Sequence, residues 1–353
     1  MTQKIDLYSM SLSELREYIV SIGEPAFRAK QIYEGICRGK RIDEIGNLPK
    51  PLRERLFAET NDTLPKVRER LVSKIDGTVK YLFELYDGAV IESVLMKYKH
   101  GNTLCISSQV GCRMGCRFCA STIGGKERDL LPSELIGQVI AAGCDSGERV
   151  SNIVMMGIGE PLDNFDNVVK FLRLVNDADG LNIGYRHISL STSGVVPKIR
   201  ELAELNLPIT LSISLHAATD EARSQIMPIN NKWNISALLC ACNEYYRKTG
   251  RRISFEYTLI RGKNDSEADA LALASLLTSS LDRGTPIHVN LIRVNEVKET
   301  GFSAGSTESA NRFAELLNKK GVVATVRRRL GSDVNAACGQ LRRKSIKEKE
   351  EKN

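Results

Sequence analysis

Two patterns of hydrophobic and polar residues divide the chain near residue 100. In the first part, apolar residues at helical spacing predict amphipathic helices over 11–21, 27–39 and 49–59, and Ser11 or Ser13 can cap the first of them. Segments 66–74, 79–86 and 89–97 alternate as strands do, with Asp-Gly pairs at 76–77 and 87–88 that predict hairpin turns. The pattern in this part of the chain therefore predicts three short helices followed by a β-hairpin extension.

After residue 100, apolar strand-like runs alternate with helical segments. The predicted strands are 103–108, 152–157, 187–192, 209–216, 252–260 and 287–294, and a further strand is possible at 322–328. The predicted helices are 132–143, 165–176, 196–205, 235–249, 266–280 and 306–321. Such alternation indicates a parallel sheet with right-handed crossovers. A partial (β/α)₆ barrel and a doubly wound α/β sheet both fit six such units.

These patterns suggest four regions. We expect a small helical accessory domain over 1–62, a β extension over 63–98, a core over 99–341, and a charged, disordered tail over 342–353. In parallel α/β architectures the chemistry lies at the carboxyl ends of the strands. The predicted strands end in CISSQVGC, MGIGEP, STSG, SLHA and NLIRVN, so one site at this edge is expected.

Composition narrows the function classes. The chain of 353 residues has 42% hydrophobic residues and a net charge of +7, which is compatible with a polyanionic partner. Basic runs lie at 50–56, 66–74, 327–329 and 342–344, although each could also be solvated surface. No apolar stretch reaches the roughly 18 residues that a membrane helix needs. The nine cysteines are unevenly spaced, unlike a secreted disulfide framework. We therefore expect a cytoplasmic protein with no membrane partner.

Three of these cysteines lie in GCRMGCRFCA, residues 111–120. Cys112, Cys116 and Cys119 have the spacing C-x₃-C-x₂-C. Thiolates bind zinc or iron–sulfur clusters, and structural zinc commonly uses two distant pairs of ligands, which this chain lacks. Three protein ligands on a [4Fe–4S] cluster would leave one iron open for a small molecule.

This spacing, with an aromatic residue before the last cysteine, resembles the signature of the radical S-adenosylmethionine (SAM) enzymes. In that superfamily the three cysteines hold a [4Fe–4S] cluster, and the amino and carboxylate groups of SAM bind the fourth iron. The resemblance therefore implies Cys112, Cys116 and Cys119 as cluster ligands, and SAM as a second cofactor, used twice in each turnover. It also favours the partial (β/α)₆ radical SAM barrel over the doubly wound sheet.

Longer motifs narrow the resemblance further. SSQVGC, VMMGIGEP, LSTSG, ISLHA, PIN and AACGQL are similar to those of the RlmN/Cfr family of RNA adenosine methyltransferases, over residues 90–341. The resemblance implies that the SAM-contacting residues are Gly159, Glu160, Ser191, Ser214, Leu215, His216 and Asn295. Taken alone, GEP at 159–161 could be an ordinary turn, and His216 could be a satisfied polar residue at a strand end. Glu296 replaces the proline usual in the family, so the local loop could differ.

The same resemblance assigns three residues to methyl transfer. Cys338 would accept the methyl group, Cys105 would then form a disulfide with Cys338, and Glu92 would be the proton acceptor. Without the family, Cys105 could be a small buried residue of its strand, Cys338 a core cysteine, and Glu92 an outward-facing carboxylate.

The family has two branches, which methylate C2 or C8 of adenosine. GEP and LSTSG favour the C2 branch, which acts on 23S rRNA and on tRNA at the adenosine 3′ of the anticodon. The C8 branch, which gives antibiotic resistance, and a non-catalytic iron–sulfur RNA-binding protein remain alternatives. We expect the N-terminal helices and the basic runs to bind RNA. We also expect a low-potential electron donor such as flavodoxin or ferredoxin, and a monomer.

Overall fold

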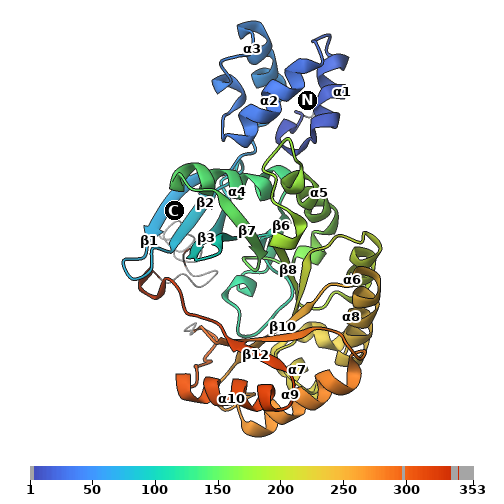
Figure 1. Cartoon of the computed structure of the whole chain (residues 1–353). Helices are drawn as coiled ribbons and strands as arrows, with labels where there is room; N and C mark the ends of the chain where they lie inside the picture. Colours follow the sequence, from blue (N-terminus) through green and yellow to red (C-terminus); the bar gives the residue numbers. More distant parts are fainter. Residues whose placement is uncertain (1–3, 296–298, 335–340, 342–353) are drawn as a thin grey trace.

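Three helices form one end of the molecule. The structure is a computed structural model that describes residues 4–295, 299–334 and 341. The helices are α1 (Leu12–Ser21), α2 (Phe27–Cys37) and α3 (Lys50–Glu59), close to the predicted ranges. Ser11 caps α1, because its Oγ accepts a hydrogen bond from the Glu14 N–H at 3.3 Å and the Glu14 carboxylate accepts one from the Ser11 N–H at 2.7 Å. Figure 1 shows these helices at the top of the view, next to the side of the molecule that carries α4 and α5.

The remaining chain is built on one sheet of ten strands, in the order β1-β2-β3-β4-β7-β8-β9-β10-β11-β12. The antiparallel part contains β1 (Lys66–Val72), β2 (Val79–Glu84) and β3 (Val90–Tyr98), and β3 pairs with β4 (Gly101–Cys105). The parallel part continues from β4 through β7 (Val150–Met155), β8 (Ile188–Thr192), β9 (Thr210–Ser214), β10 (Ile253–Leu259), β11 (Ile287–Arg293) and β12 (Val323–Val326). The β extension is therefore continuous with the core sheet.

Helices connect the successive parallel strands. They are α4 (Pro132–Ser146), α5 (Phe165–Asn176), α6 (Val196–Glu204), α7 (Asp220–Ile226), α8 (Ile235–Thr249), α9 (Glu267–Ser280) and α10 (Thr307–Lys319). Each parallel strand lies beside the next one along the chain, whereas a doubly wound sheet reverses its strand order at a switch point. The partial (β/α)₆ barrel is therefore confirmed, and β12 is the further strand. None of the helices in the described residues is both long and apolar enough to cross a membrane.

The two faces of the curved sheet differ in polarity. Outward residues such as Leu211, Phe255 and Leu291 belong to the main hydrophobic core, which the helices cover (Figure 1). On the opposite face, Ser214, Glu256, Asn290 and Thr325 lie in one row across β9 to β12. Strands of this kind are commonly apolar on both faces. A polar inner face therefore indicates a lumen that contains water or a ligand.

Candidate active site

A cavity of about 260 Å³ lies at the carboxyl ends of the parallel strands. Nine of the residues expected at the site line it: Cys112, Cys116, Cys119, Gly159, Glu160, Ser191, Ser214, His216 and Asn295. Leu215 does not line it, because its side chain is fully buried in the main core on the other face of β9. Only the backbone of Leu215 lies between two cavity residues. Cys338 lies outside the described residues.

A short two-stranded ribbon supports the cysteine loop. Strands β5 (Gln109–Gly111) and β6 (Lys126–Asp129), which the sequence did not predict, pair on either side of the loop. The N–H of Cys112 donates to the Gly125 carbonyl at 3.0 Å. A Cβ at Gly111, where φ is +79°, would lie 2.0 Å from the Gly125 oxygen, so only glycine fits there. The ribbon therefore closes the loop at its base.

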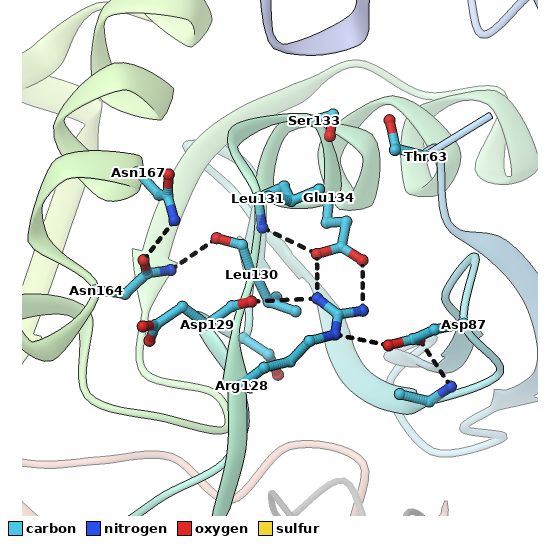
Figure 2. A network of polar contacts seen from close by, with 12 residues as sticks. Thr63, Asp87, Arg128, Asp129, Leu130, Leu131, Ser133, Glu134, Asn164 and Asn167 are labelled. Atoms are coloured by element: carbon cyan, nitrogen blue, oxygen red, sulfur yellow. Dashed lines mark hydrogen bonds and ion pairs between the residues drawn. The ribbon is translucent and has the colours of Figure 1, made fainter. Parts of the chain in front are cut away.

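A partly buried ion-pair network fixes this ribbon to the rest of the barrel (Figure 2). The Arg128 guanidinium on β6 donates to both oxygens of Glu134, at 2.7 and 2.8 Å, and to the Asp87 carboxylate at 2.7 Å. Glu134 lies in the first turn of α4, and Asp87 in the turn between β2 and β3. Asn164 also holds the segments that flank the ribbon, since its amide donates to the Ser108 and Leu130 carbonyls. The ribbon is therefore joined to a helix and to the antiparallel strands.

Two of the three thiols resist ionisation unless a cation is bound. Burial raises the pKa of Cys112 to about 12 and raises that of Cys116 well above its usual value, and thiolates this close would also repel one another. Among the described residues, no three His, Cys, Asp or Glu side chains stand close enough to bind a single metal ion. In a [4Fe–4S] cluster each thiolate binds a different iron, so the sulfur atoms stand farther apart than around one zinc ion. The three-cysteine loop thus fits a cluster better than a mononuclear zinc.

Glu160 is held rigidly in the cavity wall. Its carboxylate accepts hydrogen bonds from the backbone N–H groups of Ser193, at 2.7 Å, and Leu162, at 3.1 Å. Burial raises its pKa, and these hydrogen bonds oppose that effect in part. A Cβ on Gly159, where φ is +109°, would lie 2.7 Å from Gln109 atoms. The motif GEP therefore places a fixed carboxylate where an ammonium group of a ligand could bind.

His216 is a neutral wall of the cavity. Its Nδ1 accepts a hydrogen bond from the Thr258 N–H at 2.9 Å, and its ring contacts Phe118 edge to face, with centroids 4.9 Å apart. Burial lowers its pKa to about 3. Ser191 and Ser214 lie on neighbouring strands of the same wall, and Asn295 follows β11. This wall offers hydroxyl, amide and aromatic groups, which suit a nucleoside.

Glu92 and Cys105 lie on the inner face of the neighbouring strands. Cys105 pairs with Val94 across β3 and β4, and Glu92 precedes Val94 by two residues, so both side chains belong to one face. Only 2% of Glu92 is exposed, and Lys80 Nζ lies 3.1 Å from its Oε2. The alternative of an outward-facing carboxylate is therefore wrong. Met156 packs against Val94, Met96 and Cys105 on this inner face and also lines the cavity. The inner face of β3 and β4 therefore adjoins the cavity.

Sequence reasoning missed two buried charged residues, Arg223 and Glu256. Glu256 lines the cavity and accepts a hydrogen bond from the Asn290 amide at 2.7 Å. The alternation in RISFEYTLI, residues 252–260, puts Glu256 on one polar face and could have identified it. Arg223 lies in the seven-residue helix α7, which is too short to give a helical period.

Comparison with known proteins agrees with this geometry. Residues 106–274 match the model of the radical SAM superfamily, and residues 5–61 match the ribosomal RNA large subunit methyltransferase N-terminal domain. Proteins described as probable dual-specificity RNA methyltransferase RlmN are similar throughout. The one from Alkaliphilus oremlandii is 52% identical, covering 98% of this chain and 99% of its own length. The one from Clostridium tetani is 51% identical, covering 98% of each chain.

A solved structure shows the same fold. The crystal structure of a radical SAM methyltransferase from Sphaerobacter thermophilus superposes with a TM-score of 0.90 at 41% identity, covering 95% of this chain and 98% of that one. The resemblance stated from the motifs is confirmed, and with it the expectation of an enzyme that uses a [4Fe–4S] cluster and SAM. The chain belongs to the RlmN family of radical SAM RNA methyltransferases.

Proposed function

We propose that this protein transfers a methyl group from SAM to C2 of adenosine, both in 23S rRNA and in tRNA at the position 3′ of the anticodon. The dual-specificity description of its relatives supports two RNA substrates. The observation that supports the chemistry best is the adjacency of two groups. The three-cysteine cavity adjoins an inner face that holds a buried carboxylate, Glu92, and a buried thiol, Cys105.

The residues of the cavity divide into two sets. Cys112, Cys116 and Cys119 would bind the cluster, and the wall formed by Glu160, Ser191, Ser214, His216 and Asn295 would bind SAM. When bound, the cluster and SAM together supply the methyl group and the radical that activates it. The fixed carboxylate of Glu160 would accept hydrogen bonds from the ammonium of SAM, and the neutral ring of His216 would lie along the adenosine. The low pKa of His216 keeps a positive charge away from cationic SAM.

The chain's own groups handle the methyl group and the proton. Adenine C2 is not nucleophilic, so direct displacement at the electrophilic methyl group of SAM is unfavourable. Cys338 would accept the methyl group and hold its carbon on sulfur until that carbon bonds to C2. Glu92 would remove the proton from C2, and the Cys105 thiolate would then attack the sulfur of Cys338. As the carbon–sulfur bond breaks, the released carbon would take up a proton and become the methyl group. The resulting Cys105–Cys338 disulfide must be reduced before the next turnover.

Two further partners follow from this chemistry. RNA would be bound through phosphate contacts with the basic residues of α1–α3 and the basic runs, and the target base must leave its stack to reach the cavity. A low-potential donor such as flavodoxin or ferredoxin would supply electrons to the cluster.

The identity of the methylated nucleoside tests the proposal. RNA fragments from the peptidyl transferase region and anticodon stem-loops are incubated anaerobically with the reconstituted enzyme and labelled SAM, then digested and analysed by chromatography and mass spectrometry. We expect labelled 2-methyladenosine from both. Label only in 8-methyladenosine would favour the alternative branch, and unlabelled RNA from an enzyme with an intact cluster would favour a non-catalytic RNA-binding protein.

A further inference from the structure

Arg223 is a fully buried arginine that holds the ends of two cavity strands. Its guanidinium donates to the Ser193 carbonyl at 2.7 Å, the Ser214 carbonyl at 3.0 Å and the Leu215 carbonyl at 3.1 Å. It also donates to Asn230 Oδ1 at 3.0 Å. Ser193 follows β8, and Ser214 ends β9. One side chain therefore fixes two neighbouring strand ends that line the cavity.

The contact to Ser193 continues to Glu160. The Ser193 N–H donates to the Glu160 carboxylate, while the Ser193 carbonyl accepts from Arg223. A guanidinium that moved would release the Ser193 backbone and change the position of the carboxylate that would bind SAM. Arg223 thus acts on the cavity through its neighbours and does not itself line it.

The helix of Arg223 also covers the cysteine loop. Ile226, at the end of α7, accepts a backbone hydrogen bond from Arg117 at 2.9 Å, and Cys116 packs with Ile226, Met227 and Ile229. On the same side, Pro228 lies close to Gly115 of the loop. Arg223 therefore joins the segment that covers the cysteine loop to the ends of β8 and β9.

The charge of Arg223 has no direct acidic partner among its described hydrogen bonds. All four acceptors are uncharged oxygen atoms, and Asp220 is linked to Arg223 only through the amide of Asn230. Burial lowers the pKa of Arg223 to about 10, so it stays charged at neutral pH. A buried charge is costly unless an opposite charge compensates it. Thiolates of an assembled cluster, Cys116 among them, would provide that opposite charge.

We propose that Arg223 is a positioning residue that locks the cysteine loop to the strand ends and supplies the buried positive charge that favours the reduced cluster. Reduction adds one negative charge to the cluster, and nearby charge and hydrogen bonding set iron–sulfur potentials. Loss of the guanidinium should therefore make the cluster harder to reduce. The inference rests on the proposed cluster at Cys112, Cys116 and Cys119.

The test uses the full-length, anaerobically reconstituted protein with Arg223→Gln, Arg223→Lys and the control Arg200→Gln. Arg200 lies on α6 and pairs with Glu244 at the surface, with 47% of its side chain exposed. Iron content confirms loading, a redox titration monitored by electron paramagnetic resonance gives the midpoint potential, and equilibrium dialysis gives the affinity for SAM.

We expect Arg223→Gln to lower the equilibrium constant for reduction of the cluster at least tenfold, which lowers the midpoint potential by about 59 mV for a one-electron couple. Arg223→Lys should keep a potential near that of the wild type, because it keeps the charge. It should bind SAM about tenfold more weakly, because one ammonium cannot replace the planar fork of donors. Arg200→Gln should change neither quantity.

Unchanged potential in a fully loaded Arg223→Gln variant would overturn the charge role. Should that variant fail to fold, Arg223→Lys still decides the positioning role, since wild-type SAM affinity there would contradict it. A wild-type protein that takes up no cluster would instead refute the proposed function, so the two failures are distinguishable.

Discussion

At His216 the chain leaves β9 with a backbone φ of +60°, which is uncommon for a residue other than glycine. Its carbonyl accepts from the Asn264 amide at 2.7 Å, and its ring accepts from Thr258. The conformation turns the imidazole into the cavity while its neighbour Leu215 stays in the core. One motif, ISLHA, therefore serves the cavity and the core through alternate residues.

The low pKa of His216 makes stability depend on pH. The unfolded chain takes up a proton near pH 6.5, whereas the folded chain does so only near pH 3. Stability is therefore complete above pH 6.5 and falls as the pH drops below it, by up to about 1.4 kcal/mol per pH unit. Asparagine tolerates a positive φ and can accept from Thr258, so His216→Asn is a suitable comparison.

We expect the wild type to lose about 1.4 kcal/mol more unfolding free energy than His216→Asn between pH 7.5 and 5.5. Urea unfolding at both pH values measures the difference. Equal losses in the two proteins would show that the histidine is not held neutral by the fold.

Which residues belong to the site was easier to predict from the sequence than how each of them is buried. Their spacing and the resemblance to radical SAM enzymes together predicted Cys112, Cys116 and Cys119 as cluster ligands, and all three line the cavity. Nothing local distinguished a buried Glu92 from an exposed one, because its burial depends on Lys80 from another strand. Leu215 shows the converse, since membership of a motif did not predict on which face of β9 its side chain lies.

Among the secondary-structure elements, the β5–β6 ribbon and α7 support the cysteine loop from different sides. Both are too short for a hydrophobic period, and their conformation depends on tertiary contacts such as Arg128 with Glu134. The longer helices were predicted closely, α5 and α8 with the same bounds, because their apolar faces repeat over several turns. The sequence therefore predicted the barrel better than the parts that position its loop.

The Arg128 network allows a prediction for the ribbon. Arg128→Met would leave the fully buried Glu134 carboxylate without its bidentate partner. We expect a loss of up to about 3–5 kcal/mol of unfolding free energy, because the buried carboxylate would lose its compensating charge. Thermal and urea unfolding of the full chain measure it.

Arg247→Met is the matched control, because Arg247 also pairs with a carboxylate, Asp282, through two nitrogens but at the surface. We expect its unfolding free energy to stay close to that of the wild type. Equal effects of the two substitutions would contradict a special role of the pair between Arg128 and the buried Glu134.

At the scale of the whole molecule, α1–α3 form a helical module at one end of the barrel (Figure 1). Its exposed basic residues include Arg16, Arg38, Lys40 and Lys50. If they contact phosphates, their replacement by glutamine should weaken RNA binding and reduce the slope of log affinity against log salt by about 0.7–0.9 per contact. RNA titrations at several salt concentrations measure this slope.

A control variant neutralises four exposed basic residues near α9 and α10: Lys263, Arg283, Lys319 and Lys320. It removes the same charge from another part of the surface. We expect RNA affinity and salt dependence close to those of the wild type. Equal weakening by both variants would indicate non-specific attraction by net charge, without a dedicated RNA-binding module.

The central claim is that the cysteine cavity and the inner-face Cys105 act on one RNA base through Cys338. The most direct measurement uses reconstituted Cys105→Ala with SAM and RNA, followed by denaturing electrophoresis and mass mapping, with Cys240→Ala as the control because Cys240 is exposed on α8. We predict that Cys105→Ala accumulates RNA covalently attached to Cys338, while Cys240→Ala releases methylated RNA. Normal turnover by Cys105→Ala without an RNA adduct would contradict the account.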